Sequence, residues 1–149
     1  MWNPFLRKAS VENLRRHTNA AIAEFKDIVG SDMMVDASTF AALPVAAVLE
    51  GLSMLAQRRT HSAVEAYREA ANGFLGNETS IAAVDKFLVA FGEDLNRISA
   101  PYWTPHVLAD IIIADVFPEN NDEVFAKAHL LAIAFFRVAG QVTTRYKRL

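Results

Sequence analysis

The pair His106 and Asp110 is the clearest combination of residues in this chain that could do chemistry. In a helix the two side chains lie one turn apart on the same face, where the carboxylate can fix the imidazole tautomer and the ring can act as acid or base. Two aromatic residues stand just before the pair, and an aromatic loop over a histidine and a carboxylate predicts a small ligand pocket. Its candidate residues are Tyr102, Trp103, His106, Asp110 and Asp115, with His106 and Asp110 as the candidate catalytic groups.

A structural interpretation of the same residues competes with the catalytic one. In it, Trp103 closes the end of the core and His106 interacts locally with Asp110. The sequence favours this interpretation, because no serine stands in a nucleophile elbow that would complete a hydrolytic site. An enzyme or a small-molecule-binding protein is therefore the alternative, and a non-enzymatic protein that binds other proteins is favoured.

Metal and cofactor signatures are absent from the chain. Neither Glu-x-x-His nor His-Glu-x-x-His occurs, and there is no cysteine to supply a thiolate. His61 and Glu65 form a second pair one turn apart, but pairs of this kind commonly arise as surface interactions. The glycine-rich phosphate-binding loops are also missing. We expect no metal and no cofactor.

The elements that must position these residues are helices. Alanine is abundant, glycine and proline are sparse, and no hairpin signal occurs. Apolar residues recur at three- and four-residue spacing, which predicts a compact all-α bundle of five to seven helices in one domain over 1–149, with an N-terminal arm at 1–9 and a basic C-terminal end at 144–149. The expected helices run over about 10–29, 38–59, 61–75, 79–98, 105–117 and 121 to nearly the end.

Two of these helices are unusually apolar and are expected at the centre. The only charge between Thr39 and Ala56 is Glu50, and only two polar residues interrupt the run from Ala128 to Gly140. The first run is almost long enough to span a membrane, but Pro44 and Glu50 favour a bundle core, so we expect no transmembrane span. Pro44 should kink this helix or begin a second piece of it. Small residues should let another helix approach closely; they are Ala42, Ala46, Ala47, Gly51 and Ser53. If either apolar helix is exposed on one side, that side is a subunit interface.

Charge is unevenly distributed, although the net charge is −2. Residues 1–17 carry about +3, residues 137–149 about +4 and residues 78–123 about −7 by counting charged residues. The acidic stretch is either a solvated face or a surface that meets a basic protein, and the basic tail suits a helix C-terminus or an anionic contact. The candidate partner-binding residues are Glu93, Asp94, Asp115, Glu119, Arg145, Lys147 and Arg148.

These observations favour a non-enzymatic protein-protein interaction protein. By analogy alone, small helical proteins of this kind include cytosolic adaptors and toxin-neutralising, immunity-type proteins. The expected partner is another protein, with a basic protein and a homodimer both open. The second alternative is an anionic surface, nucleic acid or membrane, contacted by the basic termini, although nucleic-acid binders usually have a more basic domain overall. The N-terminus lacks the order of a secretory signal, and we expect a cytoplasmic protein.

Overall fold

Six α-helices make up the fold, which is described here from a computed structural model covering residues 10–56, 62–97 and 105–146. No strand occurs within these ranges, so the predicted all-α class and helix number are confirmed. In chain order the helices are α1 (Val11–Val29), α2 (Ala37–Leu55), α3 (Ser62–Leu75), α4 (Glu78–Leu95), α5 (His106–Asp115) and α6 (Asp122–Arg145).

Local sequence signals set four of the helix starts. Ser10 caps α1 as predicted, its hydroxyl oxygen accepting from the Asn13 amide at 3.2 Å. Asp36, Asn77 and Asn121 cap α2, α4 and α6 in the same way. The hydrogen bond donated by the Thr39 amide lowers the pKa of the Asp36 carboxyl below its ordinary value, because this bond stabilises the charged form.

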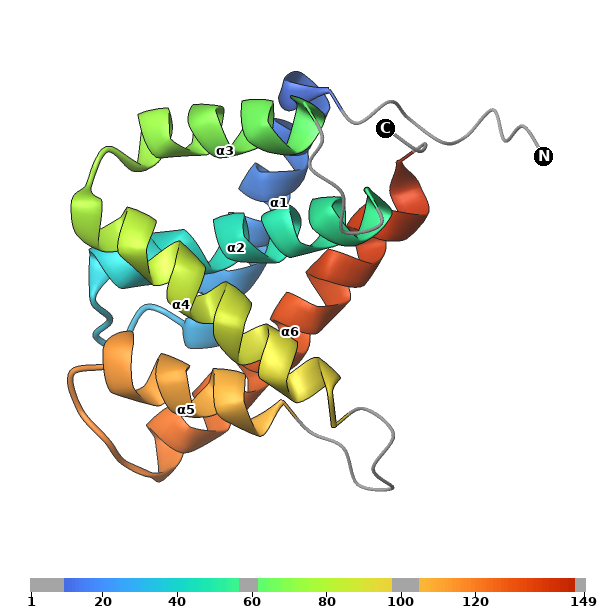
Figure 1. The fold of residues 1–149 in the computed structure, drawn as a ribbon. Coiled ribbons are helices and arrows are strands. Elements are labelled where there is room, and N and C mark those ends of the chain that lie inside the picture. Colours follow the sequence, from blue (N-terminus) through green and yellow to red (C-terminus); the bar gives the residue numbers. More distant parts are fainter. Residues whose placement is uncertain (1–9, 57–61, 98–104, 147–149) are drawn as a thin grey trace.

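Helix α2 occupies the centre of the bundle (Figure 1) and contacts α1, α3, α4 and α6. Nearly every residue from Thr39 to Leu52 is buried. The helix runs without a break through Pro44, so the proline does not begin a separate piece. By length and composition α2 is the one described helix that could cross a membrane, but the core helix of a bundle passes the same test, and most of α2 is buried inside the bundle.

Among the glycines within helices, Gly51 has the closest neighbours, and these neighbours belong to α6. A Cβ atom built on Gly51 would lie 2.4 Å from the carbonyl oxygen of Ala139 and 2.7 Å from Cβ of Val142. Such separations are far below van der Waals contact, so only a glycine fits between the two helices here. The prediction that small residues in α2 admit a second helix is confirmed at this position.

Helix α6 is central through its contacts with α1, α2 and α5, yet it is not buried all round. One side supplies nine buried residues to the core. On the opposite side, Leu130 and Ile133 are each 50% exposed. The long apolar run of α6 therefore packs into the core on one side and is exposed on the other. Helix α2, in contrast, is enclosed by the surrounding helices.

Candidate functional site

The structure places His106 at the first turn of α5, exposed to solvent. Its ring meets that of His129 edge-on, with centroids 6.0 Å apart. Asp110 is also exposed, one turn further along α5. Two further members of the predicted pocket, Tyr102 and Trp103, lie outside the described residues, as does His61. The new neighbour of His106 is thus a histidine of α6, which sequence spacing alone did not suggest.

Asp115 is not brought to the His106 end of α5. It ends the helix nine residues later, about 13 Å along the axis at 1.5 Å per residue. There its carboxylate accepts a hydrogen bond from Nζ of Lys86 on α4, at 3.1 Å. Asp115 therefore joins α5 to α4, at the opposite end of α5 from His106.

Asp94 has a structural position that the sequence analysis missed. It was a candidate for partner binding, but its side chain is 0% exposed. Its two carboxylate oxygens accept from the amides of Val107 at 3.0 Å and Leu108 at 2.8 Å, at the N-terminus of α5. Pro105, the residue before α5, offers no side-chain cap. Asp94 of α4 thus supplies the anionic acceptor that the positive end of α5 requires.

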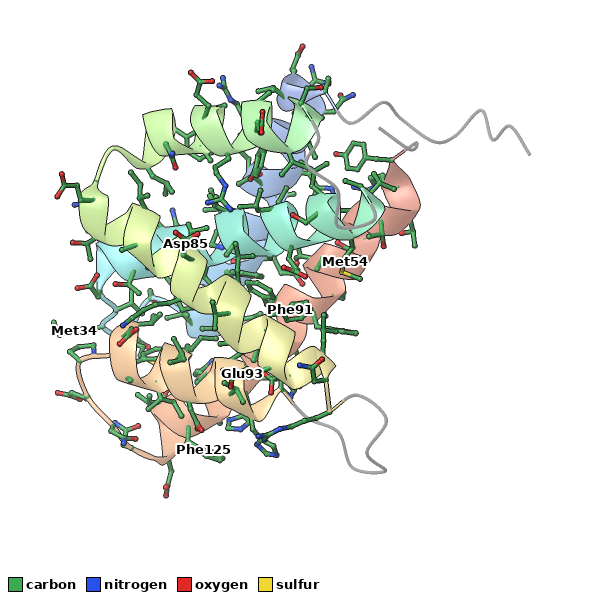
Figure 2. All side chains as sticks on the ribbon, in the orientation of Figure 1. Met34, Met54, Asp85, Phe91, Glu93 and Phe125 are labelled. Carbon is green, nitrogen blue, oxygen red and sulfur yellow. The ribbon has the colours of Figure 1, made fainter. Side chains whose placement is uncertain are left out.

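The remaining acidic and basic candidates are dispersed over the surface. Glu93 and Glu119 are exposed, and so is Arg145 in the last turn of α6. Lys147 and Arg148 lie outside the described residues. In Figure 2, Asp85 and Glu93 lie along α4, and Asp85 pairs with Arg68 of α3 at 3.1 Å. Within the stretch 78–123, Asp85 is therefore paired with a cation from outside it, Arg68, and Asp94 is not part of the surface.

A buried polar cluster joins α1 to α3 and to the end of α6. The hydroxyl groups of Thr18 and Tyr67 are 2.6 Å apart, and both side chains are fully enclosed. The Tyr146 hydroxyl donates to the carbonyl oxygen of Asn13 at 3.0 Å and lies 3.4 Å from Nδ1 of His17. Burial raises the pKa of the Tyr67 phenol, which keeps it protonated. These buried side chains connect three helices through hydrogen bonds and are not accessible to solvent, so their role is structural.

His17 should make the stability of the fold depend on pH. Burial, and then the charge of Arg145, lower the pKa of His17 below its ordinary 6.5. The unfolded chain therefore binds a proton more readily than the folded chain. The free energy of unfolding should be highest above about pH 6.5 and should fall as the pH drops below that value. Urea unfolding of the wild type and of His17→Gln at pH 7.5 and 5.5 measures this, with a smaller pH effect expected in the variant. An equal pH effect in both proteins would assign the dependence to other groups.

An apolar cleft of about 790 Å³ lies between α1 and α2. One wall is a stripe of α1 that includes Ile22 and Val29, and the other is a stripe of α2 that includes Phe40 and Pro44. The loop between the two helices closes one end, and its Met33 packs against the core. The volume lies in the range of small-molecule sites. Both a cation and an anion, Lys26 and Asp27, stand at its edge, so the cleft does not select a charge.

The outer face of α6 is the largest grouping of exposed apolar side chains among the described residues. Three of the seven large exposed apolar residues belong to α6, and the other four come singly from α2, α3, α4 and the loop after α1. Figure 2 shows Phe125 near the start of α6, well separated from Met34. Hereafter, the outer face of α6 means Phe125, Ala126, His129, Leu130, Ile133, Phe136, Arg137 and Gly140.

The outer face of α6 is held firmly by its surroundings. Near its start, Nζ of Lys127 donates to the carbonyl oxygen of Ile28 at 2.7 Å. In the middle of the helix, Arg137 pairs with Glu24 of α1. Phe136 is partly buried, with its ring 5.7 Å from that of Phe91 on α4. A partner that binds here would meet a surface that is already ordered.

Comparisons with known proteins give no further guidance on this site. The chain matches no protein-family model, no curated protein and no solved structure. Within the described ranges there is also no group of three or more histidine and acidic side chains placed to hold a metal ion. The surface chemistry of the described residues is therefore what points to a function.

Proposed function

We propose that this chain is a non-enzymatic protein-binding module that binds its partner through the outer face of α6. The observation that carries the proposal is the half exposure of Leu130 and Ile133 in the middle of a helix whose other side is core. Exposed apolar side chains that lie next to one another are typical of protein interaction surfaces, whereas isolated ones are normal on any protein.

The surroundings of these side chains support the proposal. Protein interfaces have an apolar centre and a polar rim. Here Leu130 and Ile133 form the centre, and the charges of Asp122, Glu123 and Arg145 stand toward the two ends of the helix. Ordering a surface on binding costs free energy. Because α6 is already fixed by the core and by Arg137–Glu24, that cost is small on this side.

The test compares a double variant with a matched control on the same helix. Leu130→Ser with Ile133→Ser removes the apolar centre, and Gln141→Ser changes an exposed residue outside it. Tagged forms of all three proteins are used to capture partners at physiological salt, and untagged copies of the same chain are included in each sample. We expect the double variant to lose more than 90% of the partner that the wild type and the control retain. Equal capture by all three folded proteins would overturn the proposal.

A second candidate function is the binding of an apolar small molecule in the cleft between α1 and α2. Its support is the volume of about 790 Å³ between two apolar helix stripes. Ala41 lies on the lining and is exposed, so Ala41→Trp should fill the opening without disturbing the core. If the cleft binds apolar molecules, the wild type should enhance the fluorescence of an anilinonaphthalene dye and Ala41→Trp should not. The α6 double variant is the control and should behave like the wild type.

A further inference from the structure

We infer that the partner of the outer face of α6 is a second copy of this chain, packed antiparallel about a twofold axis that passes near Ile133. The inference rests on the proposed function, because it takes α6 to be a binding face. It adds the identity of the partner and the register of the contact. The inference is based on the order of residues along the outer face of α6.

Within seven residues of Ile133, the apolar residues of the outer face of α6 match in size in both directions, and beyond that range Phe125 lies opposite Gln141. In a twofold antiparallel helix pair, a residue meets the one that lies equally far on the other side of the axis residue. Three residues from Ile133 stand Leu130 on one side and Phe136 on the other, both large and apolar. Seven residues away stand Ala126 and Gly140, both small. The register thus sets large against large near the axis and small against small two turns away.

The small residues allow the two helices to stay close beyond the axis. A Cβ atom on Gly140 would meet nothing within 4 Å, so the space over this residue is open. Ala126 is exposed in the same way, two turns on the other side of Ile133. Shallow crossing angles of about 20° keep helices in contact over several turns. The Ala126–Gly140 contacts then occur twice, once on each side of the axis.

The charges at the ends of α6 are complementary in this arrangement. Asp122 and Glu123 stand in the first turn, and Arg145 stands in the last. Antiparallel packing places the acidic start of one copy beside the basic end of the other, and it also sets the two helix dipoles in opposite directions. A parallel arrangement would place like charges together at both ends.

The remaining polar residues of the face do not oppose the pairing. His129 meets Arg137 of the second copy, four residues on either side of Ile133. The charge of Arg137 is already balanced by Glu24 within its own chain. The imidazole therefore faces an ion pair and not a lone cation.

The size of the face sets the expected strength of the dimer. Helix α6 has 24 residues, about 36 Å at 1.5 Å per residue. A single helix face buries less than the roughly 800 Å² per partner of a standard interface. We therefore expect a reversible dimer with a dissociation constant on the order of micromolar.

The chain contains no cysteine, so a single introduced thiol tests the register directly. Helix axes about 8–10 Å apart bring facing Cα atoms to about 3.4–5.4 Å, which overlaps the separations that a disulfide bridges. Purified Ile133→Cys at about 100 µM, oxidised with copper phenanthroline, should form a disulfide dimer at least ten times faster than Gln141→Cys. The latter residue is exposed on the same helix, but its symmetry mate is about 24 Å away at the level of Phe125.

Sedimentation equilibrium of the wild type and of Ile133→Glu gives an independent measurement. Ile133→Glu places two carboxylates together at the axis and should shift the protein to monomer, and circular dichroism verifies that the variant is folded. Equal cross-linking rates for the two cysteine variants, with a monomeric wild type at about 500 µM, would overturn the inference. If Ile133→Glu still abolishes capture of a different protein in that case, the proposed function stands and only the second copy is wrong. If capture is unchanged as well, both proposals fall.

Discussion

Replacing Asp94 with alanine should lower the free energy of unfolding by about 2–4 kcal/mol, although Asp94 is one of nine acidic residues in a strongly acidic stretch. Its carboxylate is fully buried and accepts from two amides at the start of α5. Removing it leaves those amides without this acceptor and removes a negative charge from the positive end of the helix. For a chain of this size we expect the melting temperature to fall by roughly 5–15 °C.

The neighbouring residue provides the control for this prediction. Glu93 is exposed, so Glu93→Ala should change the free energy of unfolding by less than about 0.5 kcal/mol. Asp94→Asn keeps one oxygen acceptor and should lie between the alanine variant and the wild type. Guanidinium unfolding followed by circular dichroism measures all three variants. A loss for Asp94→Ala no larger than that for Glu93→Ala would show that α5 does not depend on this carboxylate.

The second large effect is expected at Gly51. Gly51→Ala should destabilise the protein by about 1–3 kcal/mol, because the new methyl group would overlap the Ala139 carbonyl oxygen and Cβ of Val142. The contact at 2.4 Å is with backbone, which cannot turn aside as a flexible side chain can. The higher helix propensity of alanine offsets at most about 1 kcal/mol of this loss.

Two other helix glycines give matched controls of opposite sign. Gly73 in α3 and Gly92 in α4 have no atom within 4 Å of a built Cβ. Alanine at either position should therefore stabilise the protein by about 0.5–1 kcal/mol through helix propensity. Thermal unfolding of the three alanine variants measures the contrast. Stabilisation by all three would mean that α2 and α6 separate easily at Gly51.

These two predictions also bear on the proposed binding face. Gly51 sets how deeply α6 lies against α2, and thereby how far its opposite side stands out from the bundle. Variants of Gly51 should consequently weaken both stability and self-association. Variants of Leu130 or Ile133 should weaken association alone, because these side chains are half exposed in the single chain.

The sequence by itself determined the helices and most of their ends. Apolar spacing, alanine content and caps such as Ser10 act over a few residues, so their effects can be read from neighbouring positions. The apolar run from Thr39 to Ala56 likewise indicated a core helix, and α2 is one. Local chemistry of this kind needs no knowledge of which helix lies beside which.

Only the tertiary structure decided the roles of the charged and exposed residues. Asp94 and Glu93 are adjacent acids, but α5 lies against one and solvent against the other. His106 and Asp115 were predicted to line the same pocket, yet they lie at opposite ends of α5, and His129 of α6 is the ring that lies beside His106. The apolar runs of α2 and α6 look alike in sequence, but the surrounding helices enclose the first and leave Leu130 and Ile133 of the second exposed. Burial depends on contacts between residues far apart in the chain, and this is why the exposed side of α6 could be located only in the packed bundle.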